Sequence, residues 1–303
     1  LHDALPIFLA TDKAWTRYGE ARIRSDAQAA LVDVNQQFAN SGIPLVFEYA
    51  TAERYAGKLD EATMTLYDIY DTATAPADYY LGYVPGNYDA LLDFRARNAA
   101  NVAILMTIPV NSGPSGITDR GMRSFESLDF LVAIDSGRSE SVTTVFANML
   151  THELGHMLGL RHGVSQDLAP AGLDSDPEQV VQYRLSTNYP YGAGAVVQDE
   201  TGAGVASMMT SGWYKTPTKF PVSSPTFVKQ FSDPTVSVNV IGGDGKTKRF
   251  ALGVPDQEDS VRALRQEVRN FAISSTPLLA AWRVSVVEYY HAGLNQYFMT
   301  ANR

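Results

Sequence analysis

Apolar residues recur every three or four positions in several stretches of the chain, a spacing typical of amphipathic helices. It predicts helices at residues 20–40, 88–100 and 256–272, and a fourth that begins at Ser141 or Val142. Short apolar runs with the length of buried strands fall between them, at residues 6–10, 45–50, 102–110 and 130–134. The order strand, helix, strand, helix, strand, strand, helix predicts an α+β chain with a twisted, mostly parallel sheet and helices packed against it.

The pattern is weaker in three places. Residues 55–70 fit either a hairpin or irregular structure, and residues 71–86 have the composition of a loop. Residues 163–205 are rich in Gly, Pro, Asp and Tyr with little periodicity, and a loop this long inside a compact domain is normally functional or disordered. Apolar alternation resumes on both sides of the glycine-rich residues 242–245 and predicts a hairpin there.

The acidic residues of the long loop could bind calcium, because carboxylate oxygens are ligands that this ion prefers. The acids in question are Asp167, Asp174, Asp176 and Glu178. Their spacing does not follow a regular calcium-binding loop, so a solvated acidic loop is the favoured interpretation and calcium is the alternative.

Composition excludes several classes of protein. The 303 residues are 45% hydrophobic and 19% charged, which is ordinary for a globular chain with one large core and something small besides. A net charge of -9 argues against nucleic acid or an anionic membrane as partner, because both would repel the chain. No run of 18 apolar residues predicts a membrane span. The absence of cysteine excludes disulfides and thiolate metal ligands within this sequence.

The candidate chemistry is concentrated in residues 151–162, which read Thr-His-Glu-Leu-Gly-His-Met-Leu-Gly-Leu-Arg-His and contain three of the five histidines. His152 and His156 are four residues apart on a predicted helix, so their imidazoles project from the same face and can bind one ion. Glu153 adjoins the first ligand and has the general-base position of an H-E-x-x-H hydrolase. The alternative is a helix with unlinked histidines.

The residues after the second histidine extend this pattern. Gly159 can end the helix in the left-handed conformation at no steric cost, and the chain can then turn to bring His162 back as a third nitrogen ligand. Three protein ligands leave one coordination position open, which is typical of a catalytic zinc ion.

The complete pattern H-E-x-x-H-x-x-G-x-x-H resembles the motif of the metzincin zinc endopeptidases at every fixed position. Metzincins also have a methionine-containing turn beneath the zinc. Residues 206–210, Ala-Ser-Met-Met-Thr, resemble it and place the Met-turn at Met209, with Met208 the alternative. Some members have a tyrosine near the metal two residues after that methionine, but here this position is Ser211, so no tyrosine ligand is expected.

The resemblance extends to the reprolysin-like (adamalysin-like) branch through residues 231–234, Phe-Ser-Asp-Pro, and the helical pattern that closes the domain. It implies a zincin-like catalytic domain over residues 1–276. The sheet and helices form the N-terminal subdomain, residues 1–162, and the C-terminal subdomain, residues 163–276, is irregular and contains the Met-turn and a final helix. Metzincins pair extended substrate with an edge strand, for which residues 117–122 are the candidate, although a plain surface loop fits equally well.

The last part of the chain has a separate character. Residues 277–303 resemble the opening strands of a small module appended to secreted bacterial proteins, and His291 is expected in a strand and not at a metal. The chain opens at Leu1 without an initiator methionine, so we expect a processed or partial form that lacks its export signal. The resemblance therefore implies a secreted protein, and we expect a monomer.

Three functions are compatible with these observations. In the first, the protein is a zinc-dependent endopeptidase that hydrolyses protein or peptide substrates with a zinc-activated water and Glu153 as general base. In the second, it is a zinc-stabilised binding or adhesion module without turnover. Glu153 argues against this, because a structural zinc site needs no base and closes its fourth position. In the third, it is a zinc amidase that acts on a small non-protein amide.

Overall fold

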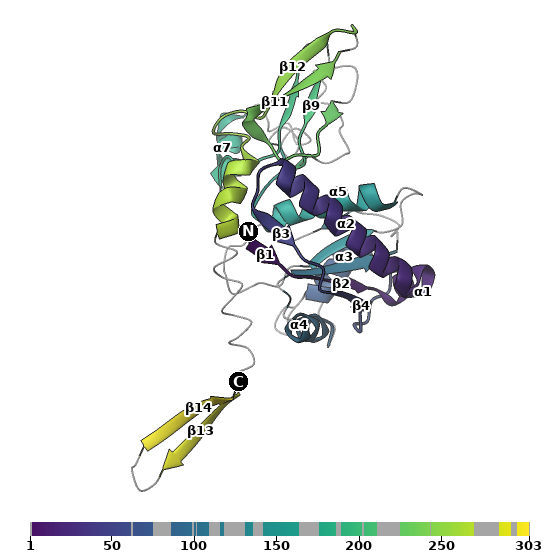
Figure 1. Ribbon diagram of the computed structural model, residues 1–303, viewed down its shortest axis with the longest axis vertical. Helices are drawn as coiled ribbons and strands as arrows, with labels where there is room; N and C mark the ends of the chain where they lie inside the picture. Colours follow the sequence, from purple (N-terminus) through teal and green to yellow (C-terminus); the bar gives the residue numbers. More distant parts are fainter. Residues whose placement is uncertain are drawn as a thin grey trace.

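The computed structural model describes residues 2–61, 63–74, 86–98, 100, 102–108, 116–117, 131–135, 142–163, 176–185, 189–201, 203–210, 225–242, 244–269, 285–291 and 296–302. The side chains of residues 2, 3, 66, 67, 74, 88, 116, 117, 131–135, 142–146 and 185, and all those beyond 269, lie outside this description. Within it, the chain is a mixed α+β structure built on a small, mostly parallel sheet (Figure 1).

The central sheet has five strands in the order β4-β2-β5-β7-β6. Four are parallel: β2 (Pro6–Ala10), β4 (Thr51–Arg54), β5 (Val102–Thr107) and β7 (Leu131–Asp135). The short strand β6 (Gly116–Ile117) pairs with β7 antiparallel and forms one edge. Strands β1 (His2–Ala4) and β3 (Leu45–Phe47) pair in parallel just before β2 and β4 in the chain. The prediction of a mostly parallel sheet is confirmed, and β5, which lies within the strand predicted at residues 102–110, is its middle strand.

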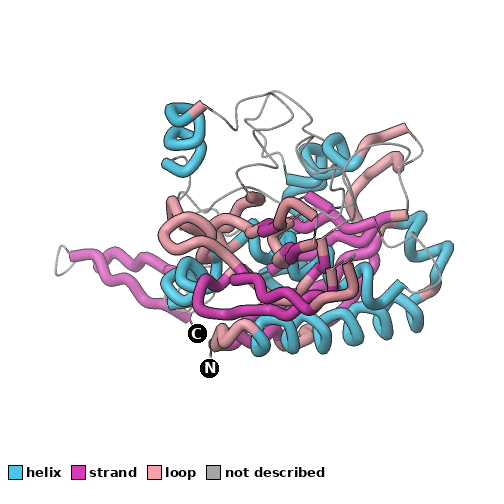
Figure 2. Tube along the Cα trace, turned by 90° about the horizontal axis from the view of Figure 1, so that it is seen from above, coloured by secondary structure: helices cyan, strands magenta, loops and turns pink. Residues whose placement is uncertain are grey.

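Helices cover both faces of this sheet, because alternate residues of each strand point to opposite sides. Phe8 and Ile104 lie in the core beneath α1 (Asp12–Tyr18), α2 (Glu20–Asn40) and α5 (Val142–Met157). On the other side, Ile7 and Leu105 lie in a second core with α3 (Leu66–Thr74) and α4 (Asn87–Arg97). Figure 2 shows the helices bordering the strands.

The predicted apolar stripe of α2 is the centre of the first core. All five positions of the stripe are buried: Ile23, Ala27, Leu31, Val34 and Phe38. The Phe38 ring meets Phe47 and Phe231 edge to face, with centroids 5.2 and 5.0 Å away. Since Phe231 comes from the C-terminal half of the chain, this aromatic cluster ties that half to the helices of the N-terminal half.

The C-terminal half consists of small elements. Strands β8 (Val196–Gln198), β9 (Gly204–Ala206) and β10 (Thr226–Phe227) form one sheet. The hairpin of β11 (Asp233–Ile241) and β12 (Thr247–Leu252) packs an apolar face against it, as predicted, and residues 260–269 are helical. A last antiparallel hairpin is formed by β13 (Ser285–His291) and β14 (Gln296–Asn302), which places His291 in a strand as expected.

Helix α1 lies between a predicted strand and a predicted helix, and two further helices also lie where no helix was predicted. Helix α3 occupies the stretch that fitted hairpin or irregular structure and continues into the predicted loop. It starts with a capping box in which Thr65 and Asp68 exchange hydrogen bonds between side chain and backbone N–H. Helix α7 (Pro177–Leu185) lies inside the predicted long loop. Asp176 caps its first turn, and a proline occupies the first helical position. The sequence therefore contains start signals for both helices, although neither has a clear apolar periodicity.

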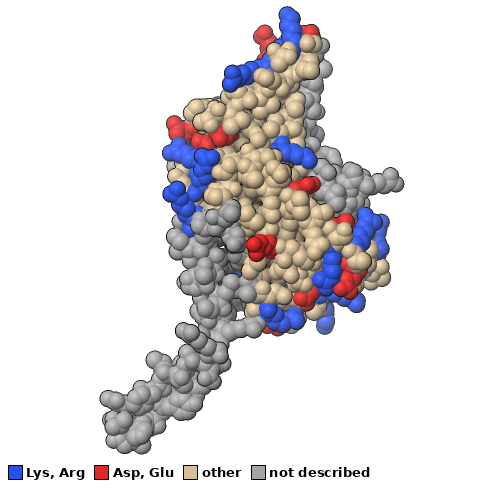
Figure 3. All heavy atoms as spheres, in the orientation of Figure 1, with Lys and Arg blue, Asp and Glu red and all other residues tan. Residues whose placement is uncertain are grey.

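Charged side chains on the described surface lie in small mixed groups (Figure 3). Exposed ion pairs such as Arg24–Glu20 and Lys13–Asp60, 2.8 and 3.1 Å long, account for several of them and contribute little to stability. In the described part of the chain, no helix has both the length and the apolar character needed to cross a bilayer.

Glu258, which precedes the last helical segment, is a half-buried acid. Burial raises the pKa of its carboxyl to about 7, and the positive charge of Arg184 on α7 offsets only part of the shift. Its Oε2 atom has no hydrogen-bond partner among the described residues. Folding therefore favours the protonated acid, so its contribution to stability is full below the unfolded pKa of 4.5 and is lost as pH rises through about 7.

We expect Glu258→Gln to remove this loss. The free energy of unfolding of the variant, minus that of the wild type, should rise by about 2–3 kcal/mol between pH 5 and pH 8, measured by urea unfolding of metal-free protein. Glu200→Gln, at an exposed position, is the control and should leave the difference flat. A flat difference for Glu258→Gln as well would mean that the carboxyl is solvated in the folded protein.

Candidate metal centre

Helix α5 positions the first two histidines. Its inner face is formed by Leu150, Leu154 and Met157, which are fully buried, so the helix cannot rotate without exposing them. His152 and His156 lie one turn apart on the adjoining face, with ring centroids 4.7 Å apart. The helix was predicted to begin at Ser141 or Val142, and its described residues begin at Val142; the shared face of the pair is confirmed.

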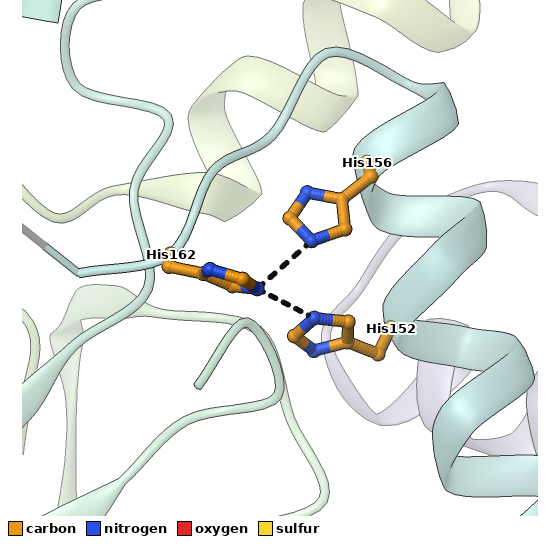
Figure 4. A group of neighbouring side chains, drawn as sticks. All are labelled: His152, His156 and His162. Atoms are coloured by element: carbon orange, nitrogen blue, oxygen red, sulfur yellow. Dashed lines mark hydrogen bonds between the residues drawn. The ribbon is translucent and has the colours of Figure 1, made fainter. Parts of the chain in front are cut away.

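The end of α5 returns the third histidine. Gly159 has a φ of 84°. Its N–H donates to the carbonyl of His156, and the N–H of Leu160 donates to that of Gly155, both at 2.9 Å, which is the Schellman pattern. The chain then reverses, and His162 Nε2 lies 2.9 Å from His152 Nε2 and 3.0 Å from His156 Nε2 (Figure 4). The prediction that the three imidazoles meet is confirmed.

Two backbone carbonyls orient the first two rings. His152 Nδ1 lies 2.9 Å from the carbonyl oxygen of Met208, and His156 Nδ1 lies 2.9 Å from that of Leu160. A carbonyl oxygen only accepts, so Nδ1 of each ring carries the proton and Nε2 of the neutral ring presents a lone pair. The lone pairs of both rings therefore face His162 Nε2, and this convergence is what a bound cation requires.

The three nitrogens could hold one metal ion. All lie within 4.8 Å of one another, and among the described residues they are the one group of three or more metal-ligating side chains this close together. His156 is 5% exposed, and the other two histidines are partly buried. Glu153 follows the first ligand on α5 and is 7% exposed, so this acidic residue has little contact with water.

Met208 and Met209 are both buried, and each contributes in a different way. Met208 supplies the carbonyl that orients His152. Met209 places its sulfur against Gly155 on α5, so close that a Cβ on that residue would lie less than 3.0 Å from it. The methionine predicted for the Met-turn thus packs beneath the helical turn between the first two ligands, and a side chain at Gly155 would displace it.

Several contributions to the site were not identified from the sequence. The carbonyls of Met208 and Leu160 are backbone groups, which no residue type reveals. Tyr183 on α7 donates its hydroxyl to the carbonyl of His162 at 3.3 Å, and the Arg161 guanidinium lies 4.9 Å from the centre of the Tyr183 ring. The helix that carries Tyr183 lies in the stretch predicted to be a loop, so its position beside the third ligand could not be anticipated.

The remaining predicted site residues divide into two groups. Asp176 caps α7, and Glu178 is exposed on the same helix. Asp167, Asp174 and Ser211 lie outside the described residues, as does most of the candidate substrate strand, 118–122. Only its first residue, Ile117, is described, as the last residue of the edge strand β6.

The carboxyl edge of the parallel sheet is the other place where a ligand could bind, because α/β sheets bind ligands where the strand order reverses. This point lies between β2 and β5, and Glu61 fills it. Its Oε1 accepts from the Thr11 hydroxyl at 2.7 Å and from the Ile108 N–H at 2.9 Å. Burial raises the pKa of Glu61, and the two hydrogen bonds oppose that shift. A carboxylate of the chain itself closes this edge.

Comparison with known proteins gives evidence on the fold alone. No family model matches the chain, and no curated protein matches it. Among solved structures, one described as "Structure of a chaperone-substrate complex" aligns with 90% of this chain at a TM-score of 0.55 and 13% sequence identity. The chain spans 35% of the length of that protein. Identity this low shows a related arrangement of helices and strands and carries no activity across.

The convergence of the three imidazoles predicts metal binding with one ion per chain. Zinc added to metal-free wild type should raise the melting temperature, because a ligand that binds only the folded state stabilises it by about 2.7 kcal/mol at a concentration one hundred times its Kd. His162→Ala should lose most of this rise, while His291→Ala, in strand β13, should keep it. Equal zinc-dependent rises in all three proteins would show that the ion binds elsewhere.

Proposed function

We propose that this protein is a zinc-dependent endopeptidase of the metzincin type, related to the reprolysin-like branch. The observation that carries the proposal is the convergence of the Nε2 atoms of His152, His156 and His162, with Glu153 beside them on α5. The matched motif supplies the same residues in the same order.

Zinc is the metal that this donor set fits best. Three imidazoles and no thiolate are a common ligand set for catalytic zinc, which keeps one position open. Tetrahedral zinc with ligands at 2.0–2.1 Å would place its nitrogens about 3.3 Å apart. The spacings of 2.9 and 3.0 Å are slightly smaller, so each ring has to move by only a few tenths of an ångström to admit the ion.

Different residues of the chain orient the metal ligands and transfer the proton. The carbonyls of Met208 and Leu160 fix the protonated nitrogens of two imidazoles, which leaves the opposite nitrogens free to bind. Glu153 takes a proton from the attacking water and passes it to the leaving amine. Zinc, when bound, polarises the scissile carbonyl and lowers the pKa of the water that attacks it.

A peptide is the substrate that the surrounding elements favour. Strand β6 is the antiparallel edge of the sheet and contacts α5, so an extended peptide paired with this edge would run past the helix that carries Glu153. A strand that adds to a sheet edge is bound through its main chain, which suits cleavage of many sequences. We therefore propose protein or peptide substrates, with the binding module as the competing function, and the family resemblance alone adds the expectation that the enzyme is secreted.

Glu153→Gln tests the proposal. Because the variant keeps the size and the ligands but loses the base, kcat/KM for an unfolded protein such as casein should fall by about 10²–10⁴-fold. Zinc content should stay near one per chain by metal analysis. Glu178→Gln, on the exposed surface of α7, should retain full hydrolysis and full zinc.

Hydrolysis assays of the wild type and Glu153→Gln distinguish the endopeptidase from the binding module. Hydrolysis that survives in Glu153→Gln and is blocked by a zinc chelator would remove Glu153 from the mechanism. A wild type that holds one zinc but cleaves no member of a peptide library would reject the endopeptidase and favour the binding module.

A further inference from the structure

Residues 192–195, Gly-Ala-Gly-Ala, run beside the segment that carries the third histidine. The N–H of Arg161 donates to the carbonyl of Gly192 at 2.9 Å, and the N–H of Gly194 donates to the carbonyl of Arg161 at 2.8 Å. These bonds form the parallel bridge between Arg161 and Ala193. The position of His162, the next residue, therefore depends on this segment.

The other side of the same segment is bonded to the turn that supports the first histidine. The N–H of Ser207 donates to the carbonyl of Ala195, and the N–H of Ala195 donates to the hydroxyl of Ser207, both at 2.9 Å. Ser207 precedes Met208, whose carbonyl accepts from His152 Nδ1. One short segment thus joins the supports of two ligands that come from different parts of the fold.

Gly194 is the point of closest approach. A Cβ on this residue would lie less than 3.0 Å from the carbonyl oxygen of Met209, 2.6 Å from its carbonyl carbon and 2.9 Å from its Cβ. The obstructing atoms include backbone, which cannot swing aside as a flexible side chain can. From the third-ligand side, a Cβ on Gly163 would lie 3.0 Å from the carbonyl oxygen of Gly194, so both neighbours pack tightly against it.

We propose that Gly194 is a positioning residue of the metal site. Because it has no side chain, residues 192–195 can contact both the segment that carries His162 and the Met208–Met209 turn. These two contacts fix the position of His162 relative to His152. The inference rests on the metal site of the proposed function but not on hydrolysis. Gly194 is not itself a metal ligand; it acts through its contacts with the backbone of neighbouring residues.

A methyl group at Gly194 would have to push the turn away by about 1 Å to reach ordinary van der Waals contact, and displacements of this size in a site cost about a hundredfold in activity. Changes to groups that orient metal ligands typically weaken metal binding by about 10–100-fold. We therefore expect Gly194→Ala to raise the zinc Kd by at least about tenfold while the chain still folds.

Gly204→Ala is the matched control. A Cβ there would lie less than 3.0 Å from the carbonyl oxygen of Val197, and 2.6 and 2.8 Å from Cγ and Cα of Gln198. The crowding is as severe as at Gly194, but it falls between strands β8 and β9, and its nearest atoms belong to none of the ligands or their supports. Both variants should therefore be less stable than wild type. Only Gly194→Ala should also change the arrangement of the metal ligands.

The experiment measures the zinc Kd by competition with a chromophoric chelator, and the visible absorption of the cobalt-substituted proteins as a report on ligand geometry. Gly194→Ala should show the weaker Kd and altered cobalt bands. Gly204→Ala should show a lower melting temperature with a Kd within about twofold of wild type and unchanged bands. Wild-type Kd and bands in Gly194→Ala, or an equal loss in Gly204→Ala, would overturn the proposal.

Gly163→Ala decides the matter if Gly194→Ala does not fold. Its milder crowding against the same segment should give an intermediate loss of zinc affinity, and a wild-type Kd would count against the proposal. Hydrolysis is measured on the same samples, so a wild type that binds zinc without cleaving peptides would reject the endopeptidase and leave this test intact.

Discussion

The site depends on two hydrogen bonds from imidazole rings to backbone carbonyls. An imidazole can offer a lone pair toward a cation only if its other nitrogen holds the proton, and the carbonyls of Met208 and Leu160 fix that proton on the far side of two rings. Without them the rings could flip or change tautomer, and the three Nε2 atoms would have no reason to face one another. The geometry of the site therefore originates in the backbone as much as in the three histidines.

The fold can supply this geometry because the elements that carry it are anchored separately. Helix α5 is fixed by its apolar face in the core beneath the sheet, and the third histidine is returned by a helix end that needs Gly159 in a left-handed conformation. The Met208–Met209 turn belongs to the C-terminal half of the chain, which is joined to the core through Phe231. Because the site is assembled from two halves, its geometry depends on how they pack. The close backbone contact at residues 192–195 helps to fix that packing.

Much of this could be predicted from the sequence because the relevant signals are local. The apolar period of α2, the alternation in the β11–β12 hairpin and the spacing of the histidine motif each follow from neighbouring residues. Helix α7 was missed because its few turns have no apolar stripe, although an aspartate cap and a proline mark its start. The carbonyls that orient the rings carry no side-chain signal. The role of Gly194 depends on a contact with Met209, fifteen residues along the chain, so no local pattern reveals it.

X-ray absorption at the zinc edge of the zinc-loaded protein is the most direct test of whether three imidazoles bind one zinc ion, because it counts the ligands independently of activity. We expect about four nitrogen or oxygen neighbours of zinc at about 2.0–2.1 Å, with the outer-shell scattering of three imidazoles. His162→Ala should reduce the imidazole count to two. A wild-type shell of six oxygens, or outer-shell scattering from fewer than three imidazoles, would contradict this expectation.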